Sequence, residues 1–401
     1  MVAYQEFVTL SQSQDSEDRG SAAHLSALAY LNHTGPADEQ AALYAALINF
    51  LDDPSVKVRA ALAYGLLHSS EAPRPIMLAL LHDSGVIARA VMQYSPVLID
   101  ADLMGLVRTL DISMLVAISQ RATMSPRLGA ALIRRQDLNL TLRVLKRCEV
   151  ALDGALLTEL AESLGDNAVA RGVLLARKDL PPVARLSLVN KVAADLRGAR
   201  MVKGALSQER LDRVLRDGTD TALTAIGERE AVKAQPSYVS ELVVTDQINT
   251  RVLLHALVTG HVMFFADCLA ELGQAPRDKV FALLEGGSRV SINALLVRCG
   301  MGEGMRNLIV RLVLHARASD LADDAAARHY VVTALTEELI AEHDGDIPEE
   351  LEAAFAYLSE QNIVLARKAA RGVMTAFVGS GAAERALPLL EQAEQLSLPA
   401  A

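Results

Sequence analysis

The stretch DPSVKVR, residues 53–59, predicts how the chain folds. Asp53 can accept backbone N–H groups as an N-cap, and Pro54 suits the first helical position because it lacks the N–H that would be unsatisfied there. Apolar residues then recur at helical spacing and predict one buried stripe. This stripe consists of Val56, Ala60, Ala63 and Leu67. Arg59 lies off the stripe, six residues after Asp53, where it can reach a neighbouring carboxylate.

The same helix start recurs along the N-terminal half of the chain. Residues 83–89 and 137–143 repeat the spacing from Asp to Arg, and residues 166–171 are one residue shorter. Asp111 keeps the cap but is followed by Ala117 at the Arg position, which predicts the weakest joint of the array. The Asp positions 53, 83, 111, 137 and 166 are separated by 30, 28, 26 and 29 residues. A near-constant period filled by two short helices indicates a helical solenoid, although HEAT and armadillo units usually have ~40–47 residues.

Two hypotheses account for the repeated Asp and Arg residues. In the first they form a structural ladder, in which each Arg pairs with the Asp of its own or the next repeat. In the second, one or two of the Arg side chains face outward and bind an acidic segment of a partner. The predicted ladder consists of Asp53, Arg59, Asp83, Arg89, Asp137, Arg143, Asp166 and Arg171.

The composition indicates an all-α fold. Hydrophobic residues make up 51% of the chain, aromatic residues only 4%, and Trp is absent, so the core must be built from Ala, Leu and Val. We predict a right-handed, HEAT-like helical-repeat solenoid with an additional C-terminal helical region, in which three helices follow the break at residues 344–348. The predicted segments are HEAT-like repeats at 1–200, a charged helical connector at 201–235, a second helical region at 236–320 and acidic helices at 321–401.

The net charge of −10 is unevenly distributed. Residues 320–401 contain 15 acidic and five basic residues, whereas residues 171–216 contain 11 basic and four acidic ones. The basic run is either a solvated helix face or a surface for a partner, and the acidic third of this chain or of a second copy is one candidate partner. The predicted basic face consists of Arg185, Lys191, Arg197, Arg200 and Lys203.

The cysteines and the N-terminus indicate a cytoplasmic protein. Cys148, Cys268 and Cys299 lack paired C-x-x-C spacing and are expected to be small buried hydrophobes. The N-terminus has neither the basic nor the apolar region of a signal peptide. The longest uncharged apolar segment, residues 252–266, is shorter than the ~20 residues that a membrane span needs.

The sequence predicts no catalytic, metal or cofactor site, and therefore no enzyme. His255 and His261 are six residues apart and would not share a helix face. The glycine-rich segments 300–304 and 379–381 lack the lysine of a phosphate-binding loop and are expected to be turns between helices. Nucleic-acid binding is not favoured, because the pI is near 5.5 and no aromatic residues accompany the basic run.

Three places carry a resemblance to a known family. They are the repeats around Arg59 and Arg89 leading into residues 94–98, the segment 117–125, and residues 253–272 followed by 294–300. Over residues 40–315 the chain resembles a family of HEAT-like alphaproteobacterial proteins catalogued as a domain of unknown function, number 2336. The resemblance implies the helical fold and carries over no catalytic residues.

We therefore predict a non-enzymatic scaffold or adaptor that binds another protein, since solenoids offer extended surfaces for helices or unfolded segments. Self-association into a homo-oligomer is an open alternative. A different class is a regulatory sensor that binds a small molecule in a pocket between the helical regions, near residues 253–265. A nucleic-acid-binding HEAT-like protein is the least favoured alternative.

Overall fold

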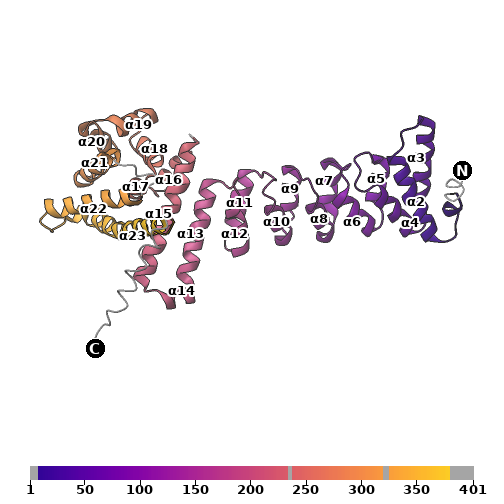
Figure 1. Ribbon diagram of the computed structural model, residues 1–401, viewed down its shortest axis with the longest axis horizontal. Helices are drawn as coiled ribbons and strands as arrows, with labels where there is room; N and C mark the ends of the chain where they lie inside the picture. Colours follow the sequence, from indigo (N-terminus) through magenta and orange to yellow (C-terminus); the bar gives the residue numbers. More distant parts are fainter. Residues whose placement is uncertain (1–7, 234–236, 319–324, 380–401) are drawn as a thin grey trace. The chain divides into compact units, whose positions relative to one another are not determined.

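The computed structural model describes residues 8–233, 237–318 and 325–379, and the regular structure of these residues is entirely helical (Figure 1). This confirms the predicted all-α class. The chain divides into two compact units, residues 1–181 (unit 1) and 182–401 (unit 2). The four predicted segments have a first boundary at residue 200 and do not coincide with these two units, and they stay a prediction.

Unit 1 is a helical-repeat array of two layers (Figure 1). Helices α4, α6, α8, α10 and α12 form one layer, in which each packs on the next, while α3 packs on α5 and α7 on α9 in the other. The first residues of these five helices are 56, 85, 112, 138 and 168, which follow the predicted period closely. The bounds are α2 Ser16–Leu31, α3 Ala37–Leu51, α4 Val56–Leu66, α5 Arg74–Leu81, α6 Gly85–Tyr94, α7 Asp100–Thr109, α8 Ile112–Ser119, α9 Pro126–Ile133, α10 Leu138–Leu145, α11 Gly154–Leu164 and α12 Ala168–Ala176.

Helix α4 differs in detail from its prediction. Its N-cap is Ser55, and Asp53 instead accepts the backbone N–H of Ser55 at 2.8 Å in the turn before the helix. Its buried side chains are Val58, Leu62, Ala63 and Leu66. Val56, expected in the buried stripe, is 44% exposed. The row spaced four residues apart, Val58, Leu62 and Leu66, is buried because its larger side chains remove more apolar area from water than the predicted, Ala-rich row would.

The other predicted Asp caps fall into two groups. Asp111 and Asp137 are N-caps, and each accepts a backbone N–H three residues further along the chain. At α6 and α12 the N-cap is the residue after the predicted Asp, namely Ser84 and Asn167. The prediction of these two caps was therefore wrong by one residue.

Unit 2 is built around α17 and α18. Every residue of 252–258 is buried, as are residues 264–269, so the segment predicted to be core is core. These two helices pack on each other, α15 and α16 pack on α18, and α21 and α23 pack on α17. The bounds are α13 Pro182–Gly198, α14 Arg200–Ala205, α15 Gln208–Val232, α16 Ser237–Val244, α17 Thr250–Val258, α18 Val262–Leu272, α19 Arg277–Gly286, α20 Arg289–Arg298, α21 Glu303–Ala318, α22 Ala325–Glu342 and α23 Glu349–Gly379.

One long helix runs through Asn362, where a second of the three helices predicted after residue 348 was expected to begin. The rest of that prediction, at residues 380–401, lies outside the described residues. Helix α23 runs without a break over 31 residues. Gly372 is its single glycine before the last residue, and proline is absent, so nothing in the sequence interrupts the helix. Asn362, predicted to begin a new helix, instead accepts a hydrogen bond from the Thr333 hydroxyl of α22 at 3.0 Å.

The glycine-rich segment 300–304 forms the turn that was predicted. Gly300 follows the C-cap of α20 with φ of +76°, a left-handed conformation that glycine adopts without steric cost. Residues 380 and 381 of the second glycine-rich segment lie outside the described residues.

Candidate functional site

The predicted ladder is present at its first joints. Arg59 donates from Nε and Nη2 to the two carboxylate oxygens of Asp83 at 2.6 and 2.9 Å, and from Nη1 to the carbonyl of Asp53 at 2.7 Å. The carboxylate of Asp53 in turn accepts from Nε and Nη2 of Arg19 at 2.8 and 3.2 Å. The guanidinium groups hold the pKa of Asp53 and of Asp83 below the ordinary value. Arg19 was missed because it lies outside the repeated spacing.

The later ladder residues behave differently. Arg89 is exposed and donates only a long 3.4 Å hydrogen bond to the Ser113 hydroxyl. Asp137 caps α10, and within the described part of the chain Arg143 has no carboxylate partner. Arg171 is buried and donates to the carbonyl of Gly165 at 2.8 Å. Asp166 takes part in an interaction of its own in the turn before α12.

A second set of arginines, which sequence reasoning missed, ties successive repeats through backbone carbonyls. Arg177 is fully buried, and its Nη atoms donate to the carbonyls of Leu145 and Val150 at 2.9 and 2.7 Å. Carbonyls at the end of a helix lack intrahelical partners and carry the negative end of its dipole. A guanidinium with five N–H donors can satisfy several of them at once.

The same arrangement occurs at three further arginines. Arg121 donates to the carbonyls of Met92 and Ser95 at 2.6 and 2.9 Å. Arg135 and Arg147 reach carbonyls at the ends of α7 and α8 in the same way. Each of these arginines lies one or two residues after a helix, so the missed signal is an Arg that directly follows a helical segment.

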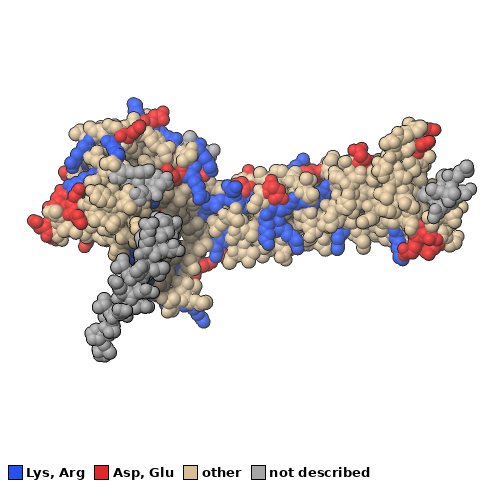
Figure 2. Space-filling model, in the orientation of Figure 1, with Lys and Arg blue, Asp and Glu red and all other residues tan. Residues whose placement is uncertain are grey.

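A basic groove lies in unit 1, between the end of α8 and α10. This hollow of about 410 Å³ is lined by Ser119, Gln120, Asn139, Leu142, Arg143, Lys146 and Arg147. Arg143 and Lys146 are exposed and have no carboxylate partner among the described residues. Arg147 is held by the carbonyl of Arg121 and pairs with Glu149 at 2.6 Å. Figure 2 shows that Lys and Arg gather over the middle of unit 1, where α9 and α10 lie in Figure 1.

The sequence around the groove explains its charge. Residues 119–148 contain seven basic residues and one acidic residue, Asp137. The groove also lies next to the repeat in which Ala117 stands at the position of the ladder Arg. This position therefore provides no Arg that could pair with Asp137 of the next repeat. The basic groove can bind carboxylate or phosphate groups through Arg143 and Lys146.

The basic face predicted at residues 185–203 lies on α13 and α14 of unit 2. Arg200 and Lys203 are exposed on the short helix α14, whereas Arg197 pairs with Asp212 at 2.9 Å. Arg185 and Lys191 are half-buried, and both take part in interactions of their own.

Arg213, from the same basic run, pairs with Glu360 of the acidic C-terminal third at 3.0 Å.

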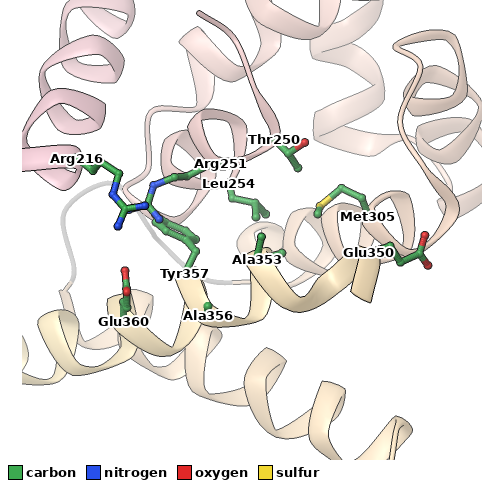
Figure 3. Close-up of a pocket in the computed structure, with 11 residues that line it drawn as sticks. Arg216, Thr250, Arg251, Leu254, Met305, Glu350, Ala353, Ala356, Tyr357 and Glu360 are labelled. Carbon is green, nitrogen blue, oxygen red and sulfur yellow. The ribbon is translucent and has the colours of Figure 1, made fainter. Parts of the chain in front are cut away.

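Unit 2 contains a cavity of about 470 Å³ between α15, α17, α21 and α23 (Figure 3). Figure 3 shows Arg216 and Glu360 at one end and Met305 and Glu350 at the other. Its lining residues are Arg216, Thr250, Arg251, Leu254, Met305, Glu350, Ala353, Ala354, Ala356, Tyr357 and Glu360. Leu254 is its only contribution from residues 253–265, where a ligand pocket was the alternative prediction.

A buried polar network holds one wall of this cavity. Arg251 donates to Asp220 and Asp217 at 2.8 and 2.6 Å, and its guanidinium carbon lies 4.8 Å from the centre of the Tyr357 ring. The Tyr357 hydroxyl and Nδ1 of His255 form a hydrogen bond of 2.9 Å. Burial lowers the pKa of His255 to about 4, so its imidazole is neutral near pH 7.

The cysteines are only partly buried, in contrast to the prediction. Cys268 is buried and Cys299 is intermediate, but Cys148 is exposed because it lies in the turn after α10. Burial raises the pKa of Cys299 to about 11 and that of Cys268 well above its usual value, so both stay protonated at neutral pH.

The described residues include no group of three or more His, Cys, Asp or Glu placed to hold a metal ion. Among them, no helix combines the length and apolar character required to cross a membrane.

A family model matches residues 87–339, more than half of the chain. The chain belongs to the family described as "Uncharacterised protein conserved in bacteria (DUF2336)". This confirms the family expected from the sequence. The DUF2336 match includes the basic groove and the part of the cavity on α15, α17 and α21, whereas Asp53, Arg59 and α23 lie outside it. No curated protein and no solved structure matches the chain.

Proposed function

We propose that this DUF2336 protein is a non-enzymatic cytoplasmic adaptor whose unit 1 holds an acidic segment of a partner protein in the basic groove. One observation carries the proposal. Arg143 of α10 and Lys146, the C-cap of that helix, line a hollow of about 410 Å³, and no carboxylate of the described residues neutralises them. Such charges attract carboxylates of a partner and accelerate its association.

The construction of the groove supports a protein segment as the occupant. Leu142 gives it an apolar contact, and Asn139 and Gln120 provide amides that can bond a peptide backbone. Arg147 is fixed by carbonyls of the preceding repeat, so one wall is rigid before any partner arrives. Extended or helical peptides are the usual ligands of stacked helical repeats.

Nucleic acid is less favoured by the same groove. Its lining contains no aromatic side chain on which a base could stack.

The test uses a fluorescein-labelled peptide of alternating Glu and Leu, titrated with the full chain while fluorescence anisotropy is recorded. The double variant Arg143→Glu/Lys146→Glu should weaken binding about tenfold or more, because two attractive contacts become repulsive. The matched control is Arg200→Glu/Lys203→Glu, which makes the same charge change at another exposed pair and should leave binding unchanged.

Circular dichroism spectra of both variants verify that they fold. Equal losses in the two double variants would show that only net charge matters, and the proposal would be wrong. Tighter binding of a single-stranded oligonucleotide than of the peptide, lost in Arg143→Glu/Lys146→Glu, would instead assign the groove to nucleic acid.

A further inference from the structure

We infer that the cavity of unit 2 binds a small amphipathic anion, with its acidic head on Arg216 and its apolar body along α23. This inference concerns unit 2 and goes beyond the adaptor function of unit 1. The volume of the cavity, about 470 Å³, falls within the range of small-molecule sites.

The apolar part of the cavity exists because α23 carries small residues there. Ala353, Ala354 and Ala356 line it, and the larger side chains of Leu254 and Met305 face them from α17 and α21. The lining extends over eleven residues of α23, from Glu350 to Glu360, whose ten steps correspond to about 15 Å at the rise of an α-helix. An elongated apolar body fits this hollow better than a compact polar one.

The charges at one end select an anionic head. Arg216 has no carboxylate partner among the described residues, and its Nε reaches only the carbonyl of Asp212 at 3.4 Å. Glu360, opposite it in Figure 3, is already paired with Arg213. Among the described residues, Arg216 is therefore the arginine at this end that makes no direct ion pair, although it lies close enough to Asp212 to interact with it electrostatically. A carboxylate can pair with its guanidinium in two-point geometry.

Arg251 and Glu350 do not reverse this preference. Two Asp side chains hold Arg251 through its Nε and Nη2 atoms, so these donors are not available to a ligand. Glu350 lies at the opposite end, in the first turn of α23, where the positive end of the helix dipole stabilises a carboxylate. A cationic group on the ligand is therefore not required.

The cavity wall is fixed before a ligand enters. Tyr357 is almost fully buried, lies beneath Arg251 and is bonded to His255, so its ring cannot move into the hollow. A wall that needs no rearrangement lowers the entropic cost of binding.

The experiment is isothermal titration calorimetry of the full chain with octanoate, octylamine and octanol, which share one apolar body and differ in the head. Octanoate should bind about tenfold or more tightly than the other two. Arg216→Ala should abolish this difference, and Ala353→Leu, which fills the hollow, should abolish binding. Matched controls are Arg210→Ala on α15 and Ala370→Leu on α23, both exposed and away from the cavity.

Equal affinities for the three compounds, tighter binding of octylamine, or full binding by a folded Ala353→Leu variant would each overturn the inference. The Arg143→Glu/Lys146→Glu variant should bind octanoate normally, so failure of this inference and failure of the adaptor function are distinguishable.

Discussion

Arg59 and Asp83 form a two-point ion pair that fastens one repeat of unit 1 to the next. Arg59 also donates to the carbonyl of Asp53, whose carboxylate is held by Arg19 of the preceding helix. Both ion pairs are largely shielded from solvent, so salt screens them less than fully exposed pairs. The first three repeats are thus linked by a continuous chain of charges.

The first prediction is that Arg59→Ala lowers the free energy of unfolding of unit 1 by about 1–3 kcal/mol, because Asp83 and the carbonyl of Asp53 lose a charged donor. The measurement is urea unfolding of a Tyr44→Trp background. Tyr44 lies in α3 and the chain contains no Trp, so this reporter follows unit 1 alone.

A double-mutant cycle with Asp83→Asn should give a coupling energy above about 0.5 kcal/mol. The lowered pKa of Asp83 means that this coupling is complete above the ordinary aspartate pKa and is lost as the pH falls through the lower, folded value. Arg89→Ala, which removes only a long contact at an exposed site, is the control and should change stability by less than about 0.5 kcal/mol. A cycle with no coupling at pH 7 would contradict the prediction.

The second prediction concerns Arg177. Arg177→Met keeps the apolar stem but leaves the carbonyls of Leu145 and Val150 without their donor and Asp179 without its partner, which should cost about 3–5 kcal/mol. Arg177→Lys should restore only a minor part, because an ammonium group cannot reproduce the planar fork of a guanidinium.

Unfolding with the same Trp reporter measures these effects. Arg134→Met, an exposed arginine on the same array, should change stability by less than about 0.5 kcal/mol. Equal losses in Arg177→Met and Arg134→Met would remove the structural role assigned to the buried guanidinium.

The arginines show how far sequence alone could predict unit 1. The period and the helices follow from local spacing, which repeats along the chain, but the same spacing left open whether Arg59 pairs with Asp53 or with Asp83. The contacts of Arg121 and Arg177 do not, since the carbonyls they reach become available only where a preceding helix ends. The surplus of positive charge in residues 119–148 is visible in the sequence. That Arg143 meets no carboxylate of the described residues depends on the packing of α8 and α10, which the sequence does not show.

The third prediction separates two glycines of α15. A Cβ at Gly227 would overlap the ring of Phe264, which is fully buried, so Gly227→Ala should destabilise unit 2 by about 1–3 kcal/mol. A Cβ at Gly218 would meet no atom, so Gly218→Ala should stabilise the same helix by about 0.5–1 kcal/mol. Unfolding of both variants in a Phe355→Trp background measures the difference, and equal effects of the two substitutions would contradict it.

Gly227 also shows what the sequence alone could not predict about unit 2. Glycines and charges between residues 201 and 235 suggested a connector, but at Gly227 the missing side chain lets α15 approach α18 closely. The sequence contains no local sign of this, because Phe264 lies far along the chain. The cavity was hidden for a related reason: Arg216, Leu254 and Met305, which line it together with Ala353 of α23, come from three other helices that lie far along the chain.

The fourth prediction is a pH dependence set by His255. Its folded pKa of about 4 lies below the ordinary value of about 6.5, so the neutral ring stabilises unit 2 fully above pH 6.5 and progressively less as the pH falls toward 4. The shift corresponds to on the order of 3 kcal/mol. Burial is the main cause, and the nearby positive charges of His261, Arg251 and Lys368 act in the same direction.

His255→Gln can hydrogen-bond but does not titrate, so the variant should lose this part of the pH dependence while the carboxylates titrate as before. Urea unfolding of both proteins between pH 7 and 4 measures this loss of pH dependence. Because His261 is present in both proteins, its contribution cancels when their stabilities are subtracted. Thr221→Val removes the hydrogen bond to Nε2 but keeps the imidazole, and should retain the native pH dependence. Parallel stability curves for the native chain and His255→Gln would show that His255 does not become protonated on unfolding in this range.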